Sequence, residues 1–422
     1  MVFIFAVLAL LGMPLAFALG FASLGGLAIS DIDFIIMPQR MMHAVDNFPL
    51  MAIPLFMLAG ELMVEAGIMI RLVNFANSVV GRLHGGLAHV TILSGTLLAA
   101  VSGAAVASAS ALGSTLVPVL RKQYPDGYSS AVIASASNLG AIIPPSNAMI
   151  VYALMAGSSV SIGGLFMAGV VPGIILAVAF MALSSYLSRE RGFPLTGEKF
   201  NLRNVLVQTR KAFIIFMMPI IIVGGIVGGI FTATEGAAIA VMYAVAIGFL
   251  VTRELKVSAL PKVCFRAAVG AAMVAALIAF ASTVTFIFTI DLVPLKLSQL
   301  MQEFTQNPMV FILLVMAMLV VVGMFLESNA AYIMLVPLFA PIALTYGIDP
   351  LYFGLLFVLN LVIGMMTPPV GVLLFVMCGI TRISITELIH NVWPYIGVQY
   401  AVLVLCVAFP SIVLTLPRFL GY

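Results

Sequence analysis

The chain has 422 residues, of which 63% are hydrophobic and only 8% are charged. Soluble domains are about 45–50% apolar and about 25% charged, so this composition excludes a soluble protein and indicates an all-α integral membrane protein that crosses the bilayer many times. The formal net charge of +3 gives no indication of a nucleic-acid partner, and the positions of the basic residues are more informative.

The N-terminal apolar run extends to Ile29, and the first basic residue of the chain is Arg40. A signal peptide starts with a basic region, which this run lacks. We therefore expect a retained first span that sits in the lipid bilayer.

Basic residues predict the orientation of the chain. Ten of the 18 Lys and Arg residues lie in two stretches, 189–211 and 253–266. Cytoplasmic loops carry an excess of Lys and Arg, so both stretches are predicted to be cytoplasmic. Residues 212–252 between them suffice for two spans with a periplasmic turn at 228–234. Residues 189–211 then form a cytoplasmic linker.

The first repeat is predicted to cover residues 1–188. Residues 89–120 lie between two cytoplasmic flanks, so we expect a re-entrant hairpin whose tip is the small-residue run 101–108. Residues 128–157 follow as a discontinuous helix, broken at Pro144-Pro145. Each proline removes a backbone donor and clashes with the preceding turn, and such a break survives at membrane depth only beside a cavity.

The second repeat is predicted to cover residues 212–422, in the opposite orientation. Residues 309–345 would form a hairpin with its tip at Glu327-Ser328-Asn329. Residues 351–378 would form a discontinuous helix broken at Pro368-Pro369, and residues 392–416 the last span. Paired breaks in inverted repeats point to the ion and substrate site of a secondary transporter, so we predict an inverted-repeat fold of the ion-transporter type with nine crossings and two hairpins.

Short matching sequences support this pairing of the two halves. Leu-Val-Pro occurs at 116–118 and again at 335–337, before each break. Asn138 and Asn360 likewise stand shortly before the breaks. The spacing differs by several residues, so the two halves are structural equivalents rather than a clean sequence repeat.

Hairpin tips and broken helices offer free carbonyl groups to a cation and helix N-termini to an anion. Neutral oxygens without carboxylates suit a monovalent cation, and we predict sodium. The predicted sodium ligands are Ser102, Gly103, Ser108, Pro144, Ser328, Asn329, Thr367, Pro368 and Gly371. The predicted substrate-binding residues are Ser146, Asn147, Asn329 and Thr367. The alternative is that these side chains only hydrogen-bond neighbouring helices, as small polar residues in membranes commonly do.

Four acidic residues lie in or near the predicted spans. Thr232 and Glu235 match a capping box, which indicates a structural role. Glu327 either caps the hairpin tip or belongs to the site, and the sequence leaves both open. Glu61 and Glu65 are four residues apart on one helix face, where a flank at the inner end is favoured over a paired site.

Enzymatic motifs are missing from the sequence. The four histidines form no metal-binding pair, and neither an HExxH motif nor a Walker A motif occurs. We therefore expect a protein that is not an enzyme and that draws energy from a gradient or a partner. No arginine clamp for an anion is evident, since Arg40 is placed in an outer loop too far from the site.

The motifs together resemble the large membrane subunit of the tripartite ATP-independent periplasmic (TRAP) transporters. They are residues 11–20 (LGMPLAFALG), residues 228–238 (GGIFTATEGAA) and both Pro-Pro segments. The resemblance spans nearly the whole chain, and the motifs keep their order.

The resemblance implies sodium-driven uptake of an organic acid, such as a C4-dicarboxylate or a sialic acid-like sugar acid, by an elevator mechanism in the bacterial inner membrane. It also implies two partners, a periplasmic binding protein and a small four-helix membrane subunit. The alternatives are an anion or cation exchanger of related fold that needs no binding protein, an intramembrane enzyme and a passive channel.

Overall fold

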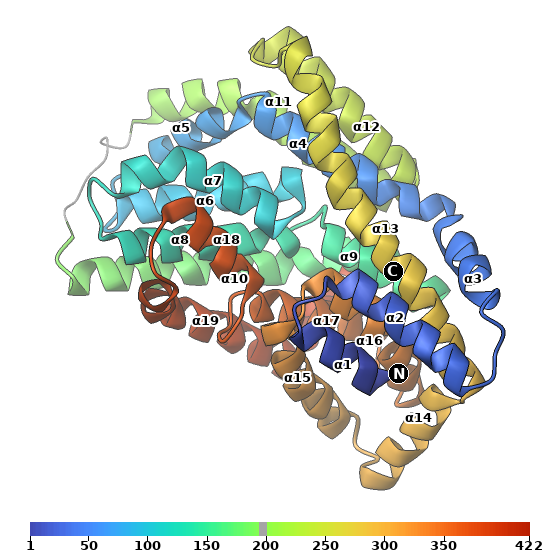
Figure 1. Ribbon diagram of the computed structural model, residues 1–422. Coiled ribbons are helices and arrows are strands. Elements are labelled where there is room, and N and C mark those ends of the chain that lie inside the picture. Colours follow the sequence, from blue (N-terminus) through green and yellow to red (C-terminus); the bar gives the residue numbers. More distant parts are fainter. Residues whose placement is uncertain (194–200) are drawn as a thin grey trace.

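The computed structural model describes residues 1–193 and 201–422, which form helices and no strand (Figure 1). The first half contains α1 (Val2–Leu10), α2 (Leu15–Ile29), α3 (Ile36–Val45), α4 (Ala52–Glu65), α5 (Ile68–Val80), α6 (Gly86–Ser102), α7 (Ala105–Leu120), α8 (Asp126–Asn138), α9 (Asn147–Ala156) and α10 (Ile162–Glu190). The second half contains α11 (Leu202–Val227), α12 (Ala233–Ala246), α13 (Leu260–Ile290), α14 (Val293–Phe304), α15 (Pro308–Phe325), α16 (Ser328–Thr345), α17 (Pro350–Gly364), α18 (Val372–Thr381), α19 (Ile385–Ala408) and α20 (Ser411–Phe419). Shorter helical segments are η1 (Phe48–Met51), η2 (Leu139–Ala141), η3 (Gly157–Ser159), η4 (Ile247–Thr252) and η5 (Val257–Ala259).

Eight helical segments in the described residues are long and apolar enough to cross a membrane. They are Phe48–Glu65, Ile162–Glu190, Leu202–Val227, Ala233–Thr252, Val257–Ile290, Pro308–Phe325, Ser328–Thr345 and Ile385–Ala408. This confirms a multi-pass, all-α membrane protein. Side-chain capping places the ends of several spans, and Thr232 and Glu235 form the predicted capping box at the start of α12.

The first predicted span is not one continuous helix but two helices. α1 ends at Leu10 and α2 begins at Leu15, after Gly12 in the left-handed region (φ 86°) and Pro14 at the N-cap. The chain reverses here, because α1 packs against α2. Neither helix alone has the roughly 20 residues that a span needs.

Two further boundaries differ from the predictions. The linker 189–211 is shorter, because α10 continues to Glu190 and the Asn201 side chain caps α11 by accepting a hydrogen bond from the N–H of Arg203. Residues 194–200 of this linker lie outside the described residues. The last span ends at Ala408 rather than at residue 416, since Pro410 interrupts the helix and α20 packs against α10.

Both predicted hairpins are helix pairs with a short break. α6 and α7 are separated by Gly103 and Ala104, and α15 and α16 by Leu326 and Glu327. The first pair has helices of 17 and 16 residues and the second has two of 18, which at 1.5 Å per residue approach the thickness of a bilayer core. Their re-entry into the membrane and the inverted orientation of the halves stay predictions.

Both predicted discontinuous helices are unwound at the double prolines. In the first, α8 continues through η2 to Ala141, and α9 begins at Asn147. In the second, α17 ends at Gly364, and α18 begins at Val372. Each pair packs beside its broken helix, α6 and α7 on α8, and α15 and α16 on α17. The broken helices thus bring the two halves to one centre, because α9 also packs against α16 and α17.

A second group of helices lies alongside this centre. α13 packs against α2, α3 and α4, and α4 packs against α12. In Figure 1, α13 runs obliquely past the hairpins and broken helices. We call α2, α3, α4, α12 and α13 the flanking group.

Candidate ion and substrate site

The first junction joins the α6–α7 break to the α8–α9 break. The carbonyl of Gly103 accepts a hydrogen bond from the backbone N–H of Asn147 at 3.0 Å. Gly103 is left-handed (φ 63°), and a Cβ added to it would lie 2.7 Å from the carbonyl oxygen of Pro145. Only glycine fits here without displacing the double-proline loop.

Neutral oxygens gather at this first junction. The hydroxyls of Ser102 and Ser108 are 2.7 Å apart and both side chains are buried. A Cβ on Gly140 would lie 2.9 Å from the Ser108 hydroxyl and 3.0 Å from the carbonyl of Ala104. The predicted sodium ligands Ser102, Gly103 and Ser108 therefore lie around one point beside the loop that carries Pro144.

The second junction joins the α15–α16 break to the α17–α18 break. The N–H of Gly371 donates to the carbonyl of Met324 at 3.2 Å. A Cβ on Gly371 (φ 56°) would lie 3.1 Å from the carbonyl oxygens of both Met365 and Thr367. Carbonyl oxygens thus converge at the loop that carries Pro368, as they do at the first junction.

Thr367 itself is buried, with its hydroxyl engaged by its neighbours. The hydroxyl donates to the carbonyl of Ile363 at 2.9 Å and lies 3.4 Å from the Tyr400 hydroxyl. Its second lone pair is free to ligate a cation, whereas its proton is used locally.

Glu327 caps the first turn of α16, which settles one of the two roles that the sequence left open. Its carboxylate accepts hydrogen bonds from the N–H of Ala330 at 3.2 Å and from the amide of Asn329 at 2.9 Å. The Ser328 hydroxyl donates to it at 3.4 Å. The same carboxylate also lines a cavity, so capping does not remove Glu327 from the site.

This central cavity has a volume of about 140 Å³ and lies between the two junctions and the flanking group. Its polar lining residues are Asn147, Glu327, Ser328 and Asn329. The Oδ1 atom of Asn147 is buried and has no hydrogen-bond partner among the described residues. A buried amide oxygen without a hydrogen bond costs free energy. Because this oxygen lies beside a cavity, it is available to accept a hydrogen bond from a ligand or to ligate a cation.

The predicted substrate residues are not all brought together. Asn147 and Asn329 line the central cavity, whereas Thr367 and Ser146 do not. Ser146 caps α9, and its hydroxyl donates to the carbonyl of Ala141 at 2.6 Å. Ser146 therefore shapes the helix terminus that the cavity borders.

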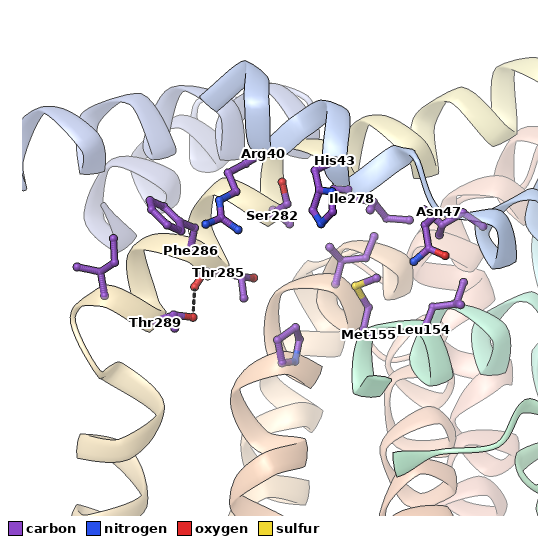
Figure 2. A pocket seen from close by; sticks show the side chains of 16 residues that line it. Arg40, His43, Asn47, Leu154, Met155, Ile278, Ser282, Thr285, Phe286 and Thr289 are labelled. Carbon is purple, nitrogen blue, oxygen red and sulfur yellow. Dashed lines mark hydrogen bonds between the residues drawn. The ribbon is translucent and has the colours of Figure 1, made fainter. Parts of the chain in front are cut away.

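A larger cavity of about 500 Å³ was missed by the sequence analysis (Figure 2). Arg40 lies on α3 and lines it, with its guanidinium carbon 4.1 Å from the centre of the Phe286 ring. Arg40 is thus part of a cavity wall and not of a distant loop. The repeated hydroxyls at Ser282, Thr285 and Thr289 on one face of α13 were the only sequence signal for it.

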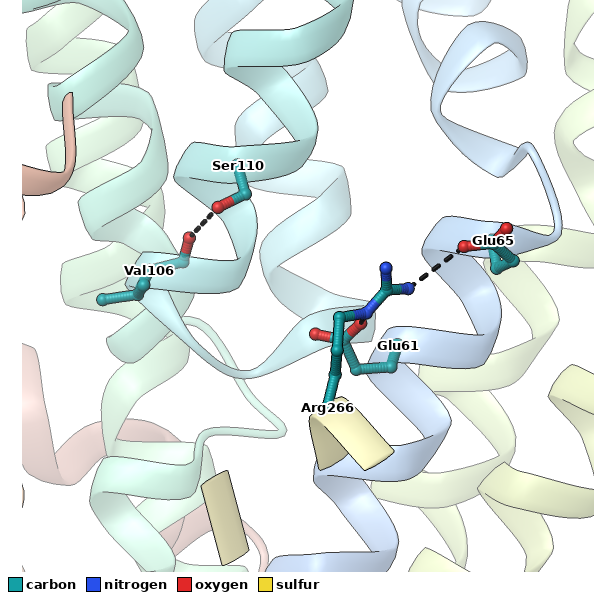
Figure 3. A network of polar contacts seen from close by, with 5 residues as sticks. All are labelled: Glu61, Glu65, Val106, Ser110 and Arg266. Atoms are coloured by element: carbon teal, nitrogen blue, oxygen red, sulfur yellow. Dashed lines mark hydrogen bonds and ion pairs between the residues drawn. The ribbon is translucent and has the colours of Figure 1, made fainter. Parts of the chain in front are cut away.

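Glu61 and Glu65 both pair with Arg266, and the prediction that they flank the inner end of a span stays a prediction. Arg266 on α13 contacts Glu61 at 2.7 Å and Glu65 at 3.0 Å (Figure 3). Figure 3 also shows Ser110 of α7, whose hydroxyl donates to the carbonyl of Val106 at 3.2 Å. The spacing of the two carboxylates was visible in the sequence, but the partner lies about 200 positions away.

The two halves are also tied together directly through a buried amide. The side-chain amide of Asn138 donates to the carbonyl of Val362 at 3.1 Å and to the side chain of Gln399 at 2.7 Å. Asn360 instead donates to the carbonyl of Met316 at 2.7 Å. The two asparagines that looked equivalent therefore have different partners.

Paired breaks around a central cavity define a polytopic membrane transporter. The fold agrees with that of a solved transporter, YdaH of Alcanivorax borkumensis, with a TM-score of 0.65, 15% identity and coverage of 90% of this chain and 89% of that one. Residues 2–412 match the model of the tripartite ATP-independent periplasmic transporter DctM component. The chain belongs to this family and is a multi-pass protein of the inner membrane.

Several curated relatives are similar over nearly the whole chain. The sialic acid TRAP transporter large permease SiaM of Vibrio cholerae is 36% identical, covering 97% of this chain and 96% of the relative. The C4-dicarboxylate large permease DctM of Rhodobacter capsulatus is 36% identical, covering 98% and 97%. The isethionate permease DctMQ of Oleidesulfovibrio alaskensis is 38% identical over 97% of this chain and 64% of its own length. These relatives are named as transporter permeases, which confirms that the chain is not an enzyme.

Proposed function

We propose that the chain takes up an organic acid together with sodium, after a periplasmic binding protein delivers the acid. The central cavity supports this proposal most strongly, because it places amide groups and two carbonyl-rich junctions next to one another. Three relatives are named for sialic acid, C4-dicarboxylates and 2,3-diketo-L-gulonate, and each of these substrates carries a carboxylate.

Sodium is proposed at both junctions. Ser102 and Ser108 with the Gly103 carbonyl would ligate one ion, and Thr367 with the carbonyls near Gly371 another. Pro144 and Pro368 lie in the two helix breaks, and Ser328 and Asn329 lie in the first turn of α16 and line the central cavity. Each net inward charge supplies about 2.3 kcal/mol per 100 mV, so two sodium ions would gain from the potential with a singly charged anion and would rely on the sodium gradient alone with a doubly charged one. Asn147 and Asn329 would then contact the substrate, with the free Oδ1 of Asn147 accepting a hydrogen bond from a substrate hydroxyl.

An elevator movement is the proposed mechanism. The moving body would contain α6–α9 and α15–α18, and the flanking group would stay fixed. In this structure the flanking group lies directly against the moving body. Gly60 of α4 packs so closely on the first junction that an added Cβ would lie 3.2 Å from the carbonyl oxygen of Ser102. That contact would have to break in each cycle.

Two partners are proposed, a small four-helix membrane subunit and the binding protein. The chain covers 64% of the DctMQ relative, which is therefore a longer protein than the part that matches.

Uptake into proteoliposomes tests the function. A thermal-shift screen of a binding protein encoded beside this chain, with succinate, N-acetylneuraminate and isethionate as test ligands, would first identify a substrate. We expect uptake only when a sodium gradient and the loaded binding protein are both present. Uptake that is indifferent to the binding protein would instead support the exchanger, and uptake without sodium would overturn the coupling.

A further inference from the structure

The 500 Å³ cavity contains Arg40 and several hydrogen-bonding side chains in its lining, and it is distinct from the central cavity. We propose that it is an outer receiving site for an organic carboxylate, with Arg40 as its charged residue. This proposal rests on the proposed function, because it supplies the first stop of the delivered anion. The cavity lies between α3, the outer end of α13, the end of α9 and α16.

The charge of Arg40 is not neutralised by a carboxylate. No ion pair of Arg40 occurs within residues 1–193 and 201–422, and the guanidinium instead lies over the Phe286 ring. Asp33, the nearest acidic residue before it, is used to cap the N–H of Ile35, and Asp46 does not line the cavity. A ring face holds the cation in place and leaves its N–H groups free for an anion.

Further side chains with hydrogen-bond donors line the same cavity. His43 and Asn47 line the cavity from the α3 side, and Thr285 lines it from α13 (Figure 2). The hydroxyls of Ser282 and Thr289 donate to their own helix, at 2.7 Å and 2.8 Å, whereas that of Thr285 has no such bond within the described part of the chain. Arg, His, Asn and Thr together offer the donors that a carboxylate needs.

A second cavity with shared wall residues lies between this site and the centre. This second cavity, of about 270 Å³, shares Leu50 and Ile278 with the outer one. It shares Ile53 and Val274 with the central one. An anion bound near Arg40 would therefore lie at one end of a row of three cavities along α13, of which the last contains Asn147 and Asn329.

Charge-selective labelling tests the proposal without knowledge of the substrate. In a chain whose three cysteines are replaced by alanine, Thr285→Cys would be treated with anionic sulfonatoethyl methanethiosulfonate or with its cationic trimethylammonium counterpart. Arg40→Gln should lower the ratio of anionic to cationic labelling rates about fivefold, because a nearby charge acts with opposite sign on the two reagents. Arg40→Lys should keep most of the ratio.

Lys296→Gln is the matched control, since it removes one exposed positive charge from α14, away from the cavity. An Arg40→Gln ratio equal to that of the control would overturn the proposal. In the full transporter, Arg40→Gln should also raise the half-saturating substrate concentration while the sodium dependence stays unchanged. If the parent chain does not transport at all, the proposed function fails, while the labelling result still decides on the receiving site.

Discussion

Gly103 shows at the residue scale how backbone conformation and site chemistry are joined. A methyl group there would collide with the Pro145 carbonyl at 2.7 Å, and the left-handed conformation adds about 1–2 kcal/mol of strain. We expect Gly103→Ala to lower the melting temperature and to weaken the stabilisation of the protein by sodium. Thermal unfolding over a series of sodium concentrations measures both effects.

Gly347→Ala provides the control for this substitution. Gly347 has φ 69°, but a Cβ added there has no neighbour within 4 Å. Gly347→Ala should therefore lower the melting temperature through backbone strain alone and leave the stabilisation by sodium unchanged. Equal sodium responses in the two variants would contradict the role of the first junction.

Thr367 is the residue on which the second sodium site depends most. Thr367→Val keeps the shape of the side chain but removes a ligand oxygen, so the sodium concentration for half-maximal uptake should rise about tenfold or more, as a loss of 1.4 kcal/mol predicts. Thr381→Val is matched, because Thr381 is also buried and its hydroxyl also donates to the carbonyl four residues earlier, at 2.7 Å. Similar sodium activation in both variants would remove Thr367 from the site.

At the scale of elements, Asn138 connects the end of α8 to α17 and α19. Asn138→Ala would leave the Val362 carbonyl and the Gln399 side chain without this donor, which should cost about 1–3 kcal/mol. Ser135→Ala is the control, since that buried hydroxyl donates only within its own helix, to Ala131 at 2.8 Å. Denaturation in detergent compares them, and an equal loss would show that the link between the halves contributes nothing.

The ion pair between α4 and α13 gives a second prediction for elements. Arg266 and its two carboxylates are each about one third exposed, so the coupling of Arg266 with Glu61 should be about 1 kcal/mol or less. A double-mutant cycle with Arg266→Gln and Glu61→Gln would measure it by unfolding at low and high salt. The coupling should shrink in salt, and a coupling that does not respond to salt would show that charge is not its source.

The elements themselves were largely predictable, because double prolines and small-residue runs act locally. Both hairpins and both broken helices lie within a few residues of their predicted bounds. The ends of spans at Gly12 and Pro410 were missed, since a long apolar run masks a local turn. The helix α14 was not predicted. Its C-terminal end is held by a contact with a distant residue, because the Tyr346 hydroxyl donates to the Thr305 carbonyl at 2.8 Å.

The site was less predictable than the fold. Neighbouring polar residues at the breaks, such as Ser146 and Asn147, have different roles, because one caps a helix and the other faces the cavity. Contacts between distant segments, such as Arg266 with Glu61 or Arg40 with Phe286, depend on packing that no local pattern encodes.

For the whole molecule, the elevator predicts that joining the flanking group to the hairpin stops transport. Met57 of α4 and Val106 of α7 line the central cavity together. With cysteine at both positions, a bifunctional thiol reagent should abolish uptake, and reduction of a cleavable linker should restore it. Each single-cysteine variant is a control, and full uptake after complete cross-linking would exclude this movement.

The central claim is that two sodium-binding junctions and one substrate cavity belong to a single transport cycle. Simultaneous measurement of radioactive sodium and substrate entering the same proteoliposomes tests it most directly. We expect both to enter together, with about two sodium ions per substrate anion, and only when the loaded binding protein is present. Substrate entry without accompanying sodium would contradict it.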